Sequence, residues 1–140
     1  MMPGSYLIDA AAGIVYSRGW GVLTDEEAAG HAQTLRADPR FDPGLRQIVD
    51  FLALTEIRLT TAGIRSVAQS NPFRRDARRA FVVGSEEGFG LTRMFASLTD
   101  SSGDAFRIFR AIEPAFEWIG LDPKTRWPVE PPDATFGPAR

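Results

Sequence analysis

Residues 78–98, RRAFVVGSEEGFGLTRMFASL, predict a buried strand, a tight turn and an amphipathic helix. Residues 80–83 form a continuous apolar run with β-branched and aromatic side chains, which is typical of a strand covered on both faces. Ser85 follows a glycine and can accept hydrogen bonds from the free amides of a helix whose first turn is acidic. Apolar residues then recur at helical spacing, namely Leu91, Met94, Phe95 and Leu98. This stretch indicates the central strand of an α/β domain, with its helix lying back on the sheet.

Strands and helices alternate on both sides of this stretch. The apolar patterns predict strands at residues 5–9, 14–18, 47–52, 80–83 and 106–109. Helices are expected to begin after Thr24, Thr60 and Ser85 and at residue 112, and residues 53–59 are expected to form a loop. The resulting order, ββαβαβαβα, predicts an α/β fold with a five-stranded mixed sheet and about four helices. The sheet would start as an antiparallel hairpin and continue with parallel strands.

A chain of 140 residues fits a single domain, which is expected to span residues 1–121. Residues 122–140 hold five of the ten prolines and show no helical or strand period, which predicts a Pro-rich C-terminal tail. The tail is expected either to be partly disordered or to run in extended form along the surface, with Trp127 and Phe136 as anchors.

The composition is that of a soluble globular protein, with 44% hydrophobic and 24% charged residues. No apolar run approaches the roughly 20 residues of a membrane helix, and the first residues lack the pattern of a secretory signal. The absence of cysteine excludes disulfides and cysteine-bound metal, so a cytoplasmic location is expected. A net charge of −2 gives no overall attraction to nucleic acid. Arginine-rich, alanine-rich usage suggests a GC-rich bacterial genome.

The chain resembles the SpoIIAA-like fold shared by STAS domains, which include the anti-sigma-factor antagonists, and by the Sec14 or CRAL-TRIO lipid-binding proteins. The likeness is greatest to small bacterial STAS/SEC14-type proteins of unknown function. It rests on an ordered set of segments: YLIDAAAGIVYSRGWG, LTDEEAAGHAQTLRADPRFDPG, QIVDFLALTEIRLTTAGI, RRAFVVGSEEGFGLTRMF and FRIFRAIEPAFEWIGL. The resemblance covers nearly all of the chain except the tail.

The resemblance implies a place for a phosphoacceptor. STAS antagonists present a serine or threonine at the start of the helix that follows the strand ending near Asp50. Thr60 is the nearest match in this sequence, and Thr61 is adjacent. A phosphate at Thr60 would lie at the positive end of a helix dipole and would add charge to a partner-facing surface. The alternative is that Thr60 only caps the helix.

An arginine cluster precedes the central strand. Arg74, Arg75, Arg78 and Arg79 lie within six residues, and with Arg58 they are candidates for an anion-binding site, because guanidinium groups bind phosphate or carboxylate in a bidentate manner. The alternative is a solubilising loop balanced by nearby carboxylates.

The residues that could serve in catalysis or metal binding each have a structural explanation. The acidic pairs at 26–27 and 86–87 fall in first turns of helices, where the helix dipole favours them. His31, the only histidine, lacks companion ligands and is expected to be solvated or half-buried. The glycine-rich turn at 84–90 lacks the lysine and the spacing of nucleotide-binding loops. We therefore predict no catalytic residues, no metal and no cofactor, and expect that the protein is not an enzyme.

Two functions remain open. The first is a non-catalytic regulatory domain that binds another protein, or a second copy of itself, through the surface around Thr60. The second is a binder of a small apolar or lipid-like ligand, as on the Sec14 side of the fold. Five phenylalanines are candidates for lining such a pocket: Phe89, Phe95, Phe106, Phe109 and Phe116. Nucleic acid and integral membrane association are not expected.

Overall fold

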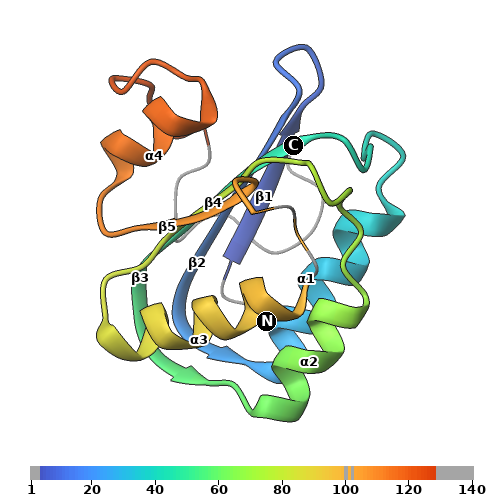
Figure 1. Ribbon diagram of the computed structural model, residues 1–140, viewed down its shortest axis with the longest axis vertical. Helices are drawn as coiled ribbons and strands as arrows, with labels where there is room; N and C mark the ends of the chain where they lie inside the picture. The colour runs from blue at the N-terminus through green and yellow to red at the C-terminus, as the bar shows by residue number, and fades with distance from the viewer. Residues whose placement is uncertain (1–3, 100, 102, 129–140) are drawn as a thin grey trace.

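The computed structural model describes residues 4–99, 101 and 103–128. The strands are β1 (Gly4–Asp9), β2 (Ile14–Thr24), β3 (Arg46–Arg58), β4 (Arg79–Val82) and β5 (Phe106–Phe109). The helices are α1 (Asp25–Ala37), α2 (Thr61–Gln69), α3 (Glu86–Leu98) and α4 (Ile112–Ile119). This order confirms the predicted ββαβαβαβα arrangement (Figure 1).

The five strands form one mixed sheet in the order β1-β2-β3-β4-β5. β1 pairs with β2 in antiparallel orientation, and the other neighbours are parallel. Figure 1 shows α1, α2 and α3 on one face of the sheet and α4 on the other. The three crossover helices lie on the same face because right-handed crossovers that step in one direction along a sheet share a face. α4 follows the last strand and covers the other face.

Both faces of the sheet carry a hydrophobic core. On the α4 side the buried residues are Ile14, Tyr16, Ile48, Ala80, Val82, Ala115, Phe116 and Ile119. On the other side they are Tyr6, Ile8, Val15, Leu35, Leu45, Phe73 and Ala77. All four residues of β4 are buried, which confirms the prediction of a central strand covered on both faces.

The second and third strands are longer than predicted. Residues 53–59 were expected to form a loop, but β3 continues to Arg58 and pairs with β2 up to Thr24. The register shifts between Arg18 and Trp20 and again between Gly21 and Val22. These bulges break the period-two alternation, so the sequence of the extension does not show a strand pattern. We call the bulged extension, residues 19–24 with 51–58, the β2–β3 arm.

The helix ends follow their sequence signals. Thr24 and Glu27 form the predicted capping box, and the side chains of Thr60 and Ser85 cap α2 and α3. Gly120 ends α4 with a φ of 93°, in the left-handed region that favours glycine. No helix among the described residues has both the length and the apolar character needed to cross a membrane.

The start of the Pro-rich segment packs against the domain. The Trp127 ring lies 5.5 Å from the ring of Tyr16 and 5.9 Å from that of Phe116, and the Arg18 guanidinium lies 4.6 Å from its centre. Trp127 therefore acts as the expected anchor. Phe136 lies outside the described residues, and the division at residue 121 stays a prediction.

Candidate ligand-binding cavity

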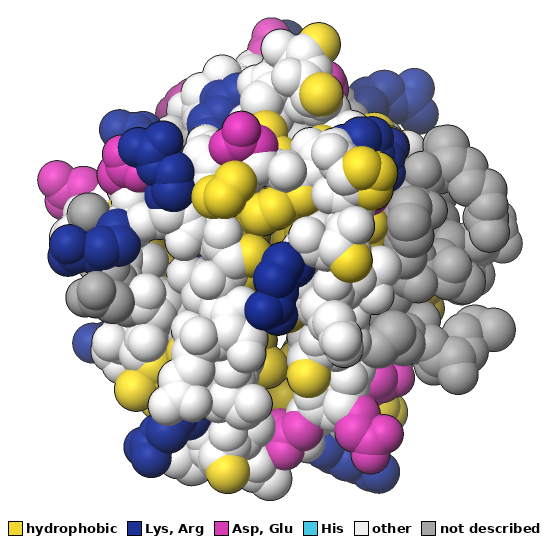
Figure 2. All heavy atoms as spheres, turned by 90° about the vertical axis from the view of Figure 1, so that its right-hand side faces the viewer, with side chains coloured by type: hydrophobic (Ala, Val, Ile, Leu, Met, Phe, Trp, Pro, Cys, Tyr) yellow, Lys and Arg dark blue, Asp and Glu magenta, His cyan; other side chains and the backbone are white. Residues whose placement is uncertain are grey.

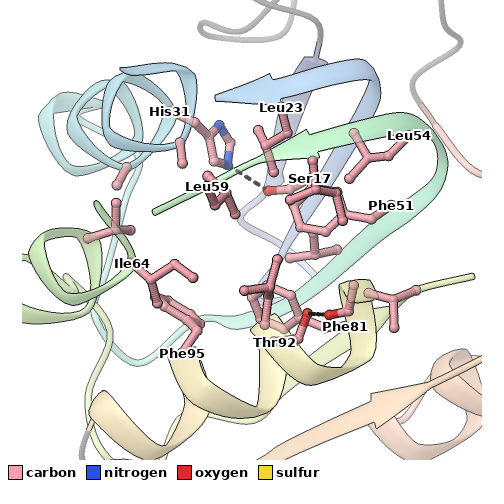
Figure 3. A pocket seen from close by; sticks show the side chains of 18 of the residues that line it. Ser17, Leu23, His31, Phe51, Leu54, Leu59, Ile64, Phe81, Thr92 and Phe95 are labelled. Carbon is pink, nitrogen blue, oxygen red and sulfur yellow. Dashed lines mark hydrogen bonds between the residues drawn. The ribbon is translucent and has the colours of Figure 1, made fainter. Parts of the chain in front are cut away.

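A cavity of about 260 Å³ lies between the sheet and the helices α1, α2 and α3. Its walls are mainly apolar, and Figure 3 shows side chains from several elements pointing into it: Leu23 and Leu54 from the β2–β3 arm, Leu59 from the connection to α2, Ile64 from α2 and Phe95 from α3. This volume approaches the roughly 300 Å³ at the lower end of small-molecule sites.

The β2–β3 arm creates this space. β4 pairs only with residues 47–50 of β3, so the arm extends past the end of β4 and forms a wall of the cavity. α3 approaches this wall at Gly88. A Cβ atom built at that glycine would lie 3.3 Å from Cδ1 of Ile57 and 3.0 Å from Oγ of Ser85. A glycine at the start of α3 therefore allows close packing against the arm.

A chain of polar side chains crosses the sheet side of the cavity. His31 Nε2 lies 3.2 Å from Ser17 Oγ, and Gln47 Nε2 donates to the same oxygen at 3.2 Å. Arg79 Nε donates to Gln47 Oε1 at 2.9 Å, and Arg79 Nη1 donates to Asn71 Oδ1 at 3.0 Å. Figure 3 shows the His31–Ser17 contact at one end of this chain. Five residues from five parts of the sequence thus form one connected polar network.

Strand geometry places this network in the cavity. Side chains two residues apart on a strand share a face, so Ser17 lies on the same face as Val15, and Arg79 on the same face as Phe81. In the parallel pairing of β3 with β4, Gln47 lies directly opposite Arg79. The polar residues therefore belong to the face that α1, α2 and α3 cover.

Arg79 is buried, with 5% of its surface exposed. Its guanidinium carbon lies 4.3 Å from the ring centre of Phe73, and further rings surround it at 5.4 to 5.6 Å: Phe81, Phe95 and Phe106. Burial lowers the pKa of Arg79 to about 9, so the side chain remains a cation at neutral pH. Among the described residues, no carboxylate forms an ion pair with it.

His31 is a neutral member of the network. Burial, and secondarily the charge of Arg79, lowers the pKa of His31 to about 4. Its ring packs edge-on against Tyr6 at 5.6 Å. The residue as a whole is half-buried, as expected. Its role in the cavity was missed, although its place among Ala28, Ala32 and Leu35 on the apolar stripe of α1 was a usable signal.

The predicted anion site does not form as one cluster. Arg79 lies inside the domain, whereas the other four arginines are exposed: Arg58, Arg74, Arg75 and Arg78. Arg58 pairs with Glu56 on the same strand at 2.6 Å. Sequence proximity misled here because residues 78 and 79 alternate across the strand, so their side chains point to opposite faces.

Arg74 and Arg78 also contact neighbouring groups. Arg74 pairs with Asp76 at 3.1 Å, and both side chains are largely exposed. Arg78 donates to the Trp118 carbonyl at 2.9 Å, and its guanidinium carbon lies 5.1 Å from the Trp118 ring centre. These contacts fit the solubilising alternative for this part of the cluster.

Thr60 caps α2 by accepting a hydrogen bond from the Gly63 amide at 3.0 Å. Its own amide and hydroxyl donate to the Asp25 carboxylate, at 3.0 and 2.6 Å. A phosphate on Thr60 would therefore meet a carboxylate as well as the helix dipole. Thr61 is the first residue of α2 and is exposed. Phosphorylation of either threonine stays a prediction.

The prediction of which phenylalanines line a pocket was largely wrong. Of the five, only Phe95 lines the cavity, and Phe109 and Phe116 pack on the α4 face instead. The other aromatic lining residues are Phe51, Phe73 and Phe81.

Comparison with known proteins supports the fold. No protein-family model matches the sequence, and no curated protein is similar to it. The structure is similar to the crystal structure of an uncharacterized protein from the DUF3478 family, with a SpoIIAA-like fold, from Shewanella loihica PV-4. The TM-score is 0.52 at 19% identity, over 76% of this chain and 83% of the other. The fold of this chain is therefore SpoIIAA-like.

Proposed function

Given this SpoIIAA-like fold, we propose that the protein is a non-catalytic binder of a small apolar molecule, which it holds in the cavity under α1, α2 and α3. The observation that carries the proposal is the cavity itself: about 260 Å³, walled mainly by aliphatic and aromatic side chains, with a few polar groups on one side. Mostly apolar concave sites with few polar groups are typical of small-molecule binding.

The distribution of apolar side chains supports a ligand inside the domain. Among the described residues, Leu52 is the one large hydrophobic residue whose side chain is well exposed, at 44%, and it lies at the cavity. Figure 2 shows the side of the molecule that is at the right in Figure 1, and its hydrophobic side chains appear only as small patches between polar and charged ones. A protein-docking surface usually offers a broader apolar patch.

The polar groups of the cavity support binding over acid–base catalysis. The carboxylates among the lining residues, Glu56 and Glu87, are both exposed. Inside, Ser17, Gln47 and Arg79 hydrogen-bond to one another in a fixed chain. Such a network orients a ligand without supplying a titrating acid and base near neutral pH.

Fluorescence of the neutral apolar dye N-phenyl-1-naphthylamine tests this function. Dye binding to the full chain is expected to raise its emission, and Ala28→Phe, which fills the cavity from α1, is expected to abolish the rise. Ala29→Phe is the matched control, because the neighbouring Ala29 is exposed and lies outside this cavity. Equal dye binding by wild type and a folded Ala28→Phe variant would reject the proposal.

The protein-binding hypothesis remains separate. It concerns the surface around Thr60, which is polar. The amide and hydroxyl of Thr60 donate to the Asp25 carboxylate there, and no contact among the described residues favours a partner protein at this surface. Light scattering of the purified full chain tests self-association directly.

A further inference from the structure

We propose that the bound molecule is an apolar carboxylic acid whose carboxylate pairs with Arg79. This inference rests on the proposed function, because it names the chemical class of the ligand for the same cavity. It follows from the charge of Arg79, from its neighbours and from its position along the cavity.

The charge of Arg79 has no anionic counterpart in the part of the chain that the structure describes. Its two hydrogen-bond acceptors are neutral amide oxygens, of Gln47 at 2.9 Å and of Asn71 at 3.0 Å. The guanidinium has five N–H donors, so donors remain beyond the two that these bonds use. Aromatic rings at 4.3 to 5.6 Å stabilise the cation but leave its net charge unchanged.

A buried cation without an anion is costly, since burial removes its hydration. Gln47 and Asn71 accept hydrogen bonds from the guanidinium, in a domain whose other described arginines lie near the surface or pair with carboxylates. An anionic ligand would supply the missing charge inside a low-dielectric cavity, where the attraction is strongest. The residue therefore has the features of a ligand-binding group.

The charge balance selects a carboxylate. One guanidinium compensates one negative charge, and the nearby His31 is neutral because its pKa is lowered to about 4. A phosphate monoester carries nearly two charges at neutral pH and would leave one uncompensated among apolar side chains. The planar carboxylate also matches the guanidinium fork.

The position of Arg79 sets the direction of the ligand. Gln47 and Arg79 lie near the amino ends of the parallel strands β3 and β4. The exposed lining residues Leu52 and Glu56 lie in the part of β3 that extends past the carboxyl end of β4, and Glu87 lies in the first turn of α3, which follows β4. At that end the carboxylate of Glu56 is already paired with Arg58, and the carboxylate of Glu87 repels an anion. The carboxylate therefore binds at Arg79, and the apolar body extends along the β2–β3 arm.

Titration calorimetry of the full chain with decanoate and with the neutral decanol tests this inference. Wild type is expected to bind decanoate about tenfold or more tightly than decanol, because a charge-assisted pair is added. Arg79→Gln is expected to remove this preference while it leaves decanol affinity within about twofold. Arg93→Gln, an exposed arginine on α3, is the matched control and should keep the preference.

The three probes together distinguish failure of the carboxylate inference from failure of the proposed function. Binding of decanol and dye without a preference for decanoate overturns the carboxylate inference and leaves the apolar-ligand function intact. A preference that persists in Arg79→Gln also overturns it. Binding of none of the three probes rejects both proposals.

NMR of the wild-type chain tests the pairing of the carboxylate with Arg79 if the Arg79→Gln variant does not fold. Decanoate, and not decanol, is expected to shift the Nε–Hε resonance of Arg79 in the nitrogen–proton spectrum. An unshifted Arg79 resonance in chain saturated with decanoate overturns the inference.

Discussion

Asp25, the first residue of α1, accepts hydrogen bonds from both the amide and the hydroxyl of Thr60, at 3.0 and 2.6 Å. The two residues are 35 positions apart, so this contact joins the start of α1 to the start of α2. α1 and α2 are both walls of the cavity, and this joint fixes their relative position.

The Asp25–Thr60 joint predicts an unusual requirement for glycine at position 63. A Cβ atom there would collide with the Asp25 carboxylate. Gly63→Ala is therefore expected to lower the free energy of unfolding by about 1–3 kcal/mol, as overpacking does. Urea unfolding measures this change. Asp25→Ala should relieve the clash, so the double variant should lose less stability than the sum of the two single variants.

Gly90→Ala is the control for this prediction. Nothing lies within 4 Å of a Cβ at Gly90, on α3, so the alanine should stabilise the helix by about 0.5–1 kcal/mol. Additive effects of Gly63→Ala and Asp25→Ala would contradict the proposed clash.

The Asp38 carboxylate is expected to stabilise the folded state at neutral pH and to lose this effect in acid. It is 6% exposed, accepts from the Tyr6 hydroxyl at 2.8 Å and pairs with Arg40 at 2.8 Å. The hydrogen bonds from Arg40, opposed by burial, hold the pKa of Asp38 well below its usual range. The folded state therefore binds the proton less tightly than the unfolded state, and the stabilisation is present above about pH 4 and is lost as the pH falls further.

Asp38→Asn is expected to lower the free energy of unfolding by about 1–3 kcal/mol at neutral pH. In urea unfolding, the difference between wild type and variant in the free energy of unfolding should narrow below about pH 4. Asp104→Asn, at an exposed position, should show neither effect. A gap that stays constant down to about pH 2 would exclude this source of acid sensitivity.

His31 predicts a second loss of stability in a different pH range. Its pKa is about 4 in the folded chain, against about 6.5 in an unfolded chain. Between these values the unfolded state binds more protons, so the free energy of unfolding falls with decreasing pH by up to about 1.4 kcal/mol per unit. His31→Gln should flatten the dependence between about pH 6.5 and pH 4. An unchanged slope in the variant would show that another group titrates there.

Trp127 predicts that the segment after α4 contributes to stability. Trp127→Ala removes the contacts with Tyr16 and Phe116 and uncovers part of the α4 core, so a loss of about 2 kcal/mol or more is expected. Trp127→Phe keeps an aromatic ring and should lose less. Thermal unfolding of the full chain compares them, and equal midpoints for wild type and Trp127→Ala would reject the anchor.

The element order, the helix caps and the central strand were predictable because each depends on local sequence. The capping box of Thr24 and Glu27 and the apolar run before Ser85 are signals of this kind. The cavity was not predictable, because bulges in the β2–β3 arm shift its inward side chains away from a regular alternation. Arg79 was predicted to belong to a cluster with the neighbouring arginines, but it is buried inside the domain. Its burial depends on the pairing of β4 with β3, which places Arg79 opposite Gln47 and which the local sequence does not show.

The β2–β3 arm also affects how copies of the chain meet one another. Beyond residue 50, β3 has no strand partner on the side where β4 ends, among the residues described, so part of its backbone edge is open. A flat edge of this kind is a template for pairing with another chain and for aggregation. The two register shifts that shape the cavity wall also twist this edge, which makes it a poor template for intermolecular strand pairing.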